Sequence, residues 1–260
     1  MNIFWKAILV CSAVFEVISL EAQEGKSSLQ YNLVEGLPNI YLDPLSEAIG
    51  CTWQYGNVWD KPLIRKFYSM LEQHKGFFVA LDVGAQTGSF SLLAKYFPNS
   101  QWYAFEPLQE AAQTLTKNLS LNNIQNVSVY QMAASLVSGW TTLKMPPMNE
   151  WGLATIGSNV MRFSPVGERT IQCVDLDSFV KSQDIEHVDF IKIDTEGWEL
   201  FILQGAEQLI LRDRPILLME HNDTNMKQCN STRDDMENFL HKLNYEWDLV
   251  SSEDILCIPN

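Results

Sequence analysis

The chain has 260 residues, of which 46% are hydrophobic, which is enough for one sizeable core with little left for a second domain. A formal net charge of −14 and a pI near 4.6 would repel the phosphates of nucleic acids, and the Lys and Arg residues form no basic cluster. No internal repeat, low-complexity tract or heptad series is visible. We therefore expect one enzyme-sized domain that does not act on RNA or DNA.

The first 22 residues have the composition of a signal peptide. Lys6 precedes a mostly apolar stretch over 7–20, and a cleavage site can be read after Ala22. Glu16 inside the apolar stretch leaves two alternatives open, a membrane anchor or a helix packed on the domain. Cleavage would leave an even number of cysteines, compatible with two disulfides: Cys51, Cys173, Cys229 and Cys257. These features favour the secretory route over the cytoplasm.

Residues 23–74 are expected to form an N-terminal helical cap on the main domain, which spans 75–260. Asp60 as a cap and Pro62 in the first turn are typical of a helix start. Apolar residues then recur at helical spacing, at Ile64, Phe67, Tyr68 and Leu71. An aromatic cluster upstream is more often used in core packing than in stacking on a sugar: Trp53, Tyr55 and Trp59.

A strand, a loop with two glycines and a helix follow one another over 77–96. A largely apolar run leads to Asp82, and Gly84 and Gly88 then bracket a loop whose backbone can approach a ligand closely. The next strand, 101–105, ends at Glu106 and Pro107. An acid at this place usually accepts hydrogen bonds from both ribose hydroxyls of a nucleotide. The pattern predicts a nucleotide site in a doubly wound sheet.

The glycine spacing separates two possible cofactors. The dinucleotide fingerprint needs glycines where Gln86 and Ser89 stand, because a pyrophosphate must reach a helix N-terminus, so these residues argue against NAD. S-adenosylmethionine lacks phosphates, and Asp82 could bind the ammonium group of its amino-acid tail. Asp82, Gly84, Gly88 and Glu106 in this order therefore favour S-adenosylmethionine over a turn that binds nothing.

The rest of the chain fits the doubly wound order. We expect a helix over 108–121, strands over 127–130 and 215–219, a helix over 234–243, and antiparallel closing strands near 245–250 and 255–258. Ala133 suits a loop beside an adenine ring, although ordinary loop packing explains it equally well. Residues 144–169 contain several prolines and glycines and predict an irregular segment that covers the substrate.

Residues 188–206 predict a buried strand that ends in acids and turns directly into a helix. Asp194 and Glu196 emerge just past the strand, Gly197 allows a sharp turn, and apolar residues over 200–206 hold the helix on the sheet. In an open parallel sheet, ligands bind at this edge. Capping of the helix by the two acids is the alternative interpretation.

These segments resemble the FkbM-type S-adenosylmethionine-dependent methyltransferases over residue 75 to about 222. The resemblance rests on the glycine loop 81–91 with 105–107, and on a later run over 174–179, 189–199, 203–206 and 214–220. It implies a class I methyltransferase fold, that is an α/β, Rossmann-like, doubly wound seven-stranded sheet with an antiparallel closing hairpin. It also implies a set of cofactor-binding residues: Asp82, Gly84, Ala85, Gly88, Glu106, Pro107 and Ala133.

The sequence departs from the family pattern at two positions. Trp198 stands where the family tends to carry a small residue, and its ring either narrows the pocket or packs on the sheet. Gln86 stands where asparagine is common, a change that should leave the loop intact. The resemblance implies O-methylation of a hydroxyl on a sugar or small natural product.

Methyl transfer to an alcohol needs a base, because the acceptor must lose its proton. Asp194, Glu196, Glu220 and His221 follow two neighbouring strands and could all face the methyl group. His221 has the best unperturbed pKa, whereas a carboxylate would need burial or a like-charged neighbour to raise its pKa. A purely structural role for His221 is equally open. A divalent cation held by Asp194, Glu220 and Asn222 is less favoured, so we expect no metal site.

The expected function is S-adenosylmethionine-dependent methylation of a small-molecule or glycan acceptor. Two alternatives remain, a protein that binds the cofactor without catalysis and an NAD-dependent oxidoreductase. The sequence leaves the acceptor and the oligomeric state open.

Overall fold

The computed structural model describes residues 28–46, 53–54, 57–58, 61–147, 150–158, 160 and 162–260. The expected signal peptide, the expected helix cap Asp60, and Cys51 lie outside these residues, as do the side chains of the upstream aromatic cluster. Within the described ranges, no helix has the length and apolar character needed to cross a bilayer.

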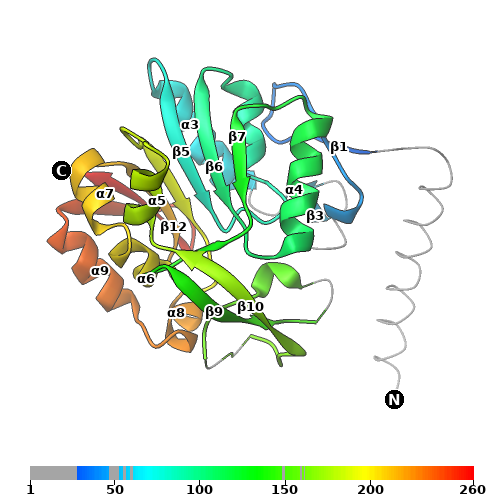
Figure 1. The fold of residues 1–260 in the computed structure, drawn as a ribbon. Coiled ribbons are helices and arrows are strands. Elements are labelled where there is room, and N and C mark those ends of the chain that lie inside the picture. The colour runs from blue at the N-terminus through cyan, green and yellow to red at the C-terminus, as the bar shows by residue number, and fades with distance from the viewer. Residues whose placement is uncertain are drawn as a thin grey trace.

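A seven-stranded sheet lies at the centre of the molecule (Figure 1). Its strands are β5 (Phe78–Val83), β6 (Ser100–Phe105), β7 (Val127–Tyr130), β11 (Phe190–Ile193), β12 (Ile216–Glu220), β13 (Tyr245–Leu249) and β14 (Asp254–Pro259). They are arranged in the order β13-β14-β12-β11-β5-β6-β7. Neighbours from β12 to β7 are parallel, whereas β14 is antiparallel to β12 and β13. The predicted doubly wound sheet with its antiparallel closing hairpin is confirmed.

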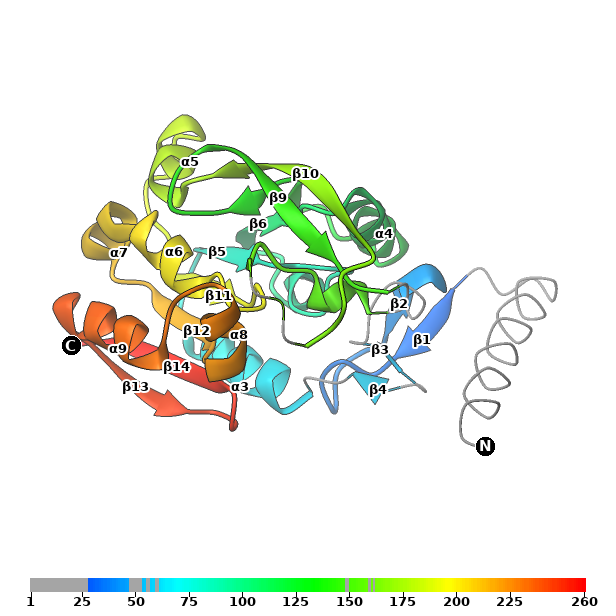
Figure 2. The ribbon, with the colours of Figure 1, turned by 90° about the horizontal axis from the view of Figure 1, so that it is seen from below.

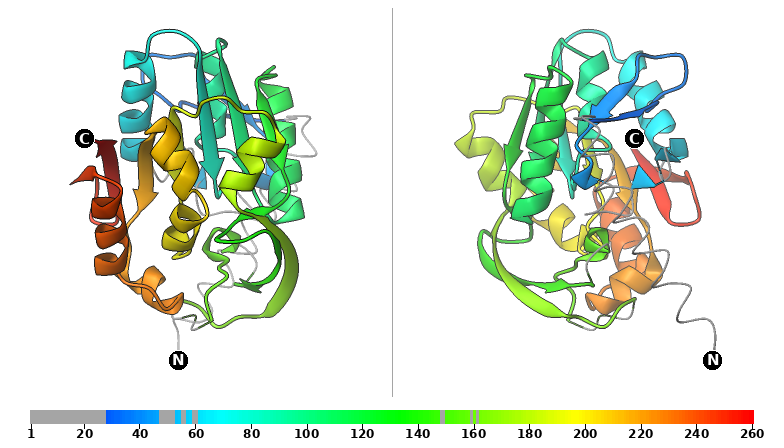
Figure 3. Two further views of the ribbon diagram at one scale, coloured as in Figure 1. Left: turned by 60° about the vertical axis from the view of Figure 1, so that its left-hand side comes forward. Right: turned by 90° about the vertical axis from the view of Figure 1, so that its right-hand side faces the viewer.

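Helices cover both faces of this sheet (Figure 3). One face carries α5 (Leu176–Ser182), α6 (Glu199–Gln204), α7 (Glu207–Asp213) and α9 (Arg233–Lys242), and the other carries α3 (Lys61–Gln73), the 3₁₀ helix η1 (Ser91–Tyr96) and α4 (Gln109–Leu121). The alternation of side chains along each strand supplies both cores. In β5, Val79 and Leu81 join the first core, while Phe78 and Ala80 join the second.

Aromatic packing fixes α3 on the sheet. The ring of Phe67 meets those of Phe90, Trp102 and Phe190 edge to face, with centroid distances of 5.7, 6.3 and 6.1 Å. Such pairs contribute roughly 0.5–1.5 kcal/mol each beyond the area they bury. The helix predicted in the N-terminal cap is therefore present.

The described part of the cap also contains strands that the sequence did not predict. β1 (Leu29–Tyr31) pairs with β2 (Ile40–Leu42), and β3 (Trp53–Gln54) pairs with β4 (Asn57–Val58). Asn122, at the end of α4, accepts a hydrogen bond from Tyr41 N at 2.9 Å and donates one to Tyr41 O at 2.6 Å. This side chain satisfies the backbone of β2 as a neighbouring strand would.

A separate three-stranded sheet lies past the carboxyl ends of the central strands (Figures 1 and 2). It is formed by β8 (Ala133–Ala134), β9 (Gly139–Met145) and β10 (Gly167–Val174), in the order β8-β10-β9. The prediction of an irregular segment over 144–169 was therefore wrong at its ends, which belong to an antiparallel pair. Between them lies the 3₁₀ helix η2 (Trp151–Leu153).

Three of the four cysteines considered for disulfides are unpaired in the described part of the chain. Cys173, Cys229 and Cys257 are free, buried thiols. Burial raises the pKa of the Cys229 thiol to about 12, so this group is not a reactive thiolate at neutral pH.

Candidate functional site

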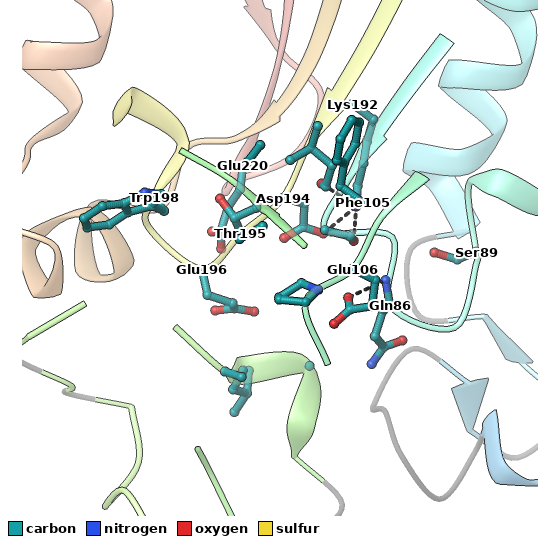
Figure 4. Close-up of a pocket in the computed structure, with 18 of the residues that line it drawn as sticks. Gln86, Ser89, Phe105, Glu106, Lys192, Asp194, Thr195, Glu196, Trp198 and Glu220 are labelled. Carbon is teal, nitrogen blue, oxygen red and sulfur yellow. Dashed lines mark hydrogen bonds and ion pairs between the residues drawn. The ribbon is translucent and has the colours of Figure 1, made fainter. Parts of the chain in front are cut away.

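A cavity of about 480 Å³ lies at the carboxyl ends of β5, β6, β11 and β12 (Figure 4). Its volume is in the range of sites for small molecules and cofactors. Four of the residues expected to bind the cofactor line it: Gly84, Glu106, Pro107 and Ala133. Three of the four expected catalytic residues line it as well: Asp194, Glu196 and Glu220. The cavity therefore joins the two halves of the predicted site.

Gly84 allows β5 and β11 to meet at the cavity. Its φ is +77°, and a Cβ added there would lie 1.8 Å from the carbonyl oxygen of Asp194. Both the conformation and the space therefore require glycine. Gly88 has a φ of +106° and packs against Leu115 of α4, so it shapes the loop from behind and does not line the cavity.

Glu106 follows β6, and its side chain lies in the cavity wall (Figure 4). Its two carboxylate oxygens accept hydrogen bonds from Gln86 N at 2.9 Å and from Leu108 N at 2.8 Å. Burial raises the pKa of Glu106 to about 7, although these two bonds act in the opposite direction. Each oxygen has a second lone pair, so the group can still accept bonds from a ligand.

The wall next to Glu106 is apolar. It is formed by Phe105, Pro107, Leu108, Ala133, Ala134 and Leu143. Two of these residues, Ala133 and Ala134, are the small residues of β8.

Asp82 does not take the position expected of it. Its side chain is buried behind the wall, where Oδ2 accepts a hydrogen bond from Ser91 Oγ at 2.5 Å. Its other oxygen lies 3.5 Å from Lys192 Nζ. Lys192 does line the cavity and donates a hydrogen bond to Gly84 O at 2.8 Å. Asp82 is thus placed to hold Lys192 and the glycine loop, and direct contact with an ammonium group is not supported. Ala85 also lies outside the cavity lining.

Asp194, Glu196 and Glu220 form the acid cluster of the site. One oxygen from each carboxylate lies within 4.8 Å of the others. Figure 4 shows the three side chains next to one another, with Glu106 and Gln86 on another side of the cavity. Asp194 and Glu196 come from the loop after β11, and Glu220 ends β12. Adjacent parallel strands therefore bring the acids together, as the sequence predicted.

Two carboxyl groups of the acid cluster have raised pKa values. Burial, followed by repulsion from Asp194, raises the pKa of Glu196 to about 8. Burial also raises the pKa of Glu220 well above its ordinary value, and repulsion from Glu196 adds to this. Carboxyl groups of this kind can accept a proton near neutral pH.

Two residues that the sequence did not single out hold the cluster in place. Asn225, in α8 (Asp223–Gln228), donates hydrogen bonds to Glu196 Oε2 at 2.8 Å and to Glu220 Oε1 at 2.6 Å. Arg162 pairs with the same oxygen of Glu196 at 2.6 Å. No pattern in the sequence places either residue at the site. Both lie far along the chain from the strands, and only the folded structure brings them to the acids.

Glu199 organises the turn that carries the acids. Its Oε1 accepts hydrogen bonds from Thr195 N at 2.7 Å and Thr195 Oγ1 at 2.8 Å, and from Gly197 N at 3.3 Å. Glu196 has a φ of +58° and Gly197 a φ of +105°, where a Cβ would lie 2.0 Å from Asn225 O. No side chain caps α6, so Asp194 and Glu196 do not act as its helix caps, and Glu199 holds the turn before the helix.

His221 does not face the cavity. Its Nε2 lies 3.1 Å from Glu237 Oε1 of α9, and burial, followed by repulsion from Arg233, lowers its pKa. The expectation that all four candidate bases face one point was therefore wrong for His221. Asn222 is also occupied, since its Oδ1 accepts hydrogen bonds from Thr224 N and Asn225 N and caps α8.

The 144–169 segment does reach the site. Trp151, Leu153, Ile156 and Arg162 line the cavity opposite the strand ends. Trp198 also lines it, donates a hydrogen bond to Ser135 Oγ at 3.0 Å and stacks on Phe201 at a centroid distance of 4.2 Å. The ring therefore lines the cavity and packs against its neighbours at the same time.

Comparison with known proteins gives a consistent result. Residues 82–247 match the family described as the methyltransferase FkbM domain. Methyltransferase sdnD of Sordaria araneosa is 28% identical over 156 residues, covering 49% of this chain and 60% of that protein. The chain thus matches less than two thirds of the length of this curated relative.

Two solved structures show likeness at low identity. Methyltransferase FkbM of Methylobacillus flagellatus KT is 17% identical, with a TM-score of 0.48, over 72% of this chain and 45% of that one. SMU.1697c of Streptococcus mutans, a putative methyltransferase in complex with SAH, is 11% identical with a TM-score of 0.46, over 74% of this chain and 95% of that one.

Proposed function

The chain belongs to the FkbM family of methyltransferases, and from this premise we propose that it methylates a hydroxyl oxygen on a neutral sugar, glycan or small natural product. The proposed methyl donor is S-adenosylmethionine. The observation that carries the proposal is that three carboxylates, Asp194, Glu196 and Glu220, line the same cavity as Glu106 and Gly84.

The side of the cavity near Glu106 suits the donor. A carboxylate that already accepts two backbone hydrogen bonds is rigidly held and can accept two more from ribose hydroxyls. The apolar wall around Ala133 suits the adenine ring, and the loop that begins at Gly84 lines the cavity where the amino-acid tail would lie. These features support S-adenosylmethionine over a ligand with phosphates, which the acids would repel.

The acid cluster suits a neutral acceptor. In the transfer, the acceptor oxygen forms a bond to the methyl carbon while the carbon–sulfur bond breaks, and the electron pair of that bond stays on sulfur as S-adenosylhomocysteine. The hydroxyl proton passes to a carboxylate of the cluster, for which Glu196 is the best placed by its partial exposure and raised pKa. An acidic acceptor would be repelled, whereas a sugar hydroxyl brings no charge.

The test uses the full chain, S-adenosylmethionine with a ¹³C-labelled methyl group, and a panel of free sugars, glycans and hydroxylated small molecules. We expect one labelled methyl ether per turnover and an equal amount of S-adenosylhomocysteine. NMR of the labelled methyl group distinguishes oxygen from nitrogen as its new partner. Labelling on nitrogen, or on a carboxylate as a methyl ester, would contradict the proposed reaction.

Binding is measured separately by calorimetric titration with S-adenosylmethionine and with NAD. Binding of the first ligand, without transfer to any member of the panel, would favour the alternative of a non-catalytic cofactor-binding protein. Binding of NAD alone would overturn the choice of cofactor.

A further inference from the structure

The acid cluster contains an open ligand atom. Glu220 is 7% exposed, and its Oε1 accepts the hydrogen bond from Asn225. Its other oxygen, Oε2, is buried and accepts no hydrogen bond from the described residues, although the residue lines the cavity. A buried carboxylate oxygen without a donor is costly, so this atom points to a missing positive partner.

The acid cluster carries more negative charge than the neighbouring cationic side chains neutralise. Arg162 pairs with Glu196, and Lys192 lies 3.6 Å from Asp194 but also pairs with Asp82. Glu220 accepts its hydrogen bond from a neutral amide.

We propose that Asp194, Glu196 and Glu220 bind a hard divalent cation, Mg²⁺ or Mn²⁺, at this end of the cavity. Carboxylate oxygens are the ligands that these ions prefer, and the three oxygens within 4.8 Å of one another can share one ion. We expected no metal site from the sequence. The less favoured alternative was a cation held by Asp194, Glu220 and Asn222, and the present proposal has Glu196 in place of Asn222. Asp194 is partly exposed, which leaves room for water or an acceptor on the ion.

The ion gives the site a more specific substrate class. A cation held there would bind the hydroxyl oxygen of the acceptor and lower the pKa of that hydroxyl. Acceptors with two adjacent hydroxyls, such as vicinal diols, would be favoured because both oxygens could reach one ion. This use of the ion rests on the proposed methylation, whereas ion binding itself does not.

Ion binding is tested on the full chain with Mn²⁺ alone, without cofactor or acceptor. Electron paramagnetic resonance follows the signal of free Mn²⁺, which disappears on binding. We expect one ion per chain, and at least tenfold weaker binding in Glu196→Gln and in Glu220→Gln. Glu72→Gln is the matched control, because Glu72 lies on α3 at the opposite end from the cavity-lining residues Pro62 and Leu63 and should leave binding unchanged.

The variant Arg162→Gln provides an independent test of ion binding. Arg162 pairs with an oxygen of Glu196, so its removal should free that oxygen and tighten Mn²⁺ binding severalfold. Weaker binding in this variant would contradict the assignment. No binding by the wild-type chain, or unchanged binding in both glutamine variants, would overturn the proposal, and neither result depends on whether methyl transfer occurs.

Discussion

The ammonium group of Lys192 lies 3.5 Å from Oδ1 of Asp82, between two central strands of the sheet. Both residues are at most 3% exposed. Lys192 also donates to Gly84 O, so this ion pair connects β11 to the start of the glycine loop. A buried pair of this kind matters most when one partner is removed, because the other charge then stays in the interior.

Lys192→Met should lower the free energy of unfolding by about 3–5 kcal/mol, because Asp82 would lose its cationic partner. Denaturant unfolding at pH 7 measures this loss. The double variant Lys192→Met with Asp82→Asn should recover part of it, since the stranded carboxylate is gone. A double variant whose loss equals the sum of the two single losses would show that the two residues are not coupled.

Gly84→Ala should unfold more easily and bind S-adenosylmethionine less tightly than the wild type, because the added Cβ would lie 1.8 Å from Asp194 O. Gly76→Ala is the matched control. Gly76 also has a positive φ, +103°, but nothing lies within 4 Å of its Cβ position. The control should cost about 1–2 kcal/mol for the backbone conformation alone. Equal losses of unfolding free energy in both variants would mean that the structure accommodates the added Cβ next to Asp194 without further destabilisation.

Affinity for the proposed donor should rise with pH through about 7. Burial raises the pKa of Glu106 to about 7, and only the ionised carboxylate accepts hydrogen bonds from both ribose hydroxyls. The group is mostly protonated at pH 6 and mostly ionised at pH 8, so the affinity should increase roughly tenfold over this interval. Calorimetric titration across the range checks it. Glu106→Gln should bind more weakly and lose this dependence on pH, and an unchanged profile in the variant would assign the titration to another group.

Glu196→Gln should lower turnover by roughly 10²–10⁴-fold if the acid cluster takes the acceptor's proton. His221→Gln should leave turnover within about twofold, because His221 faces Glu237 of α9 and lies outside the cavity lining. Steady-state kinetics of both variants separate these roles, with S-adenosylmethionine affinity as the check on the binding site. A large loss of turnover in His221→Gln alone would reverse the assignment.

Asn225→Asp should lower the free energy of unfolding at pH 8 by about 3 kcal/mol, because two hydrogen bonds to buried carboxylates would be lost and a third acid placed against them. Asn99→Asp, at an exposed position, is the control for the added charge. Thermal unfolding of both variants gives the difference. A destabilisation no larger than that of the control would show that Asn225 does not hold the acids together.

The sequence predicted the strands, and the acids at their ends, from the spacing of apolar residues and from the order of the elements along the chain. Apolar runs located β5, β11 and β12, and parallel neighbours had to bring Asp194 and Glu220 to one edge of the sheet. Gly84 and Gly197 were recognised because only glycine suits their turns.

The sequence could not predict which way individual side chains point, or which residues far apart in the chain come into contact. Asp82 and Lys192 alternate onto the same face of adjacent strands, and this pairing appears only once the register of Lys192 against Asp82 is known. A charged residue within the apolar run of β11 was the available signal. His221 follows Glu220 directly, and a single step along the chain turns its side chain to the other side. Asn225 and Arg162 come from elements with no periodic pattern that pointed to the site.

The two walls of the cavity have different origins in the chain. Glu106, Gly84 and the acids follow strands of the central sheet, whereas the opposite wall comes from the insertion between β8 and α5, whose described strands pair with each other and with β8. Under the proposed function, changes within 144–169, other than at Thr155 and Arg162, which bond to Glu196, would alter acceptor choice and leave the central sheet intact. Exchanging this segment between relatives is a route by which evolution, or an engineer, could give the same catalytic core a new substrate.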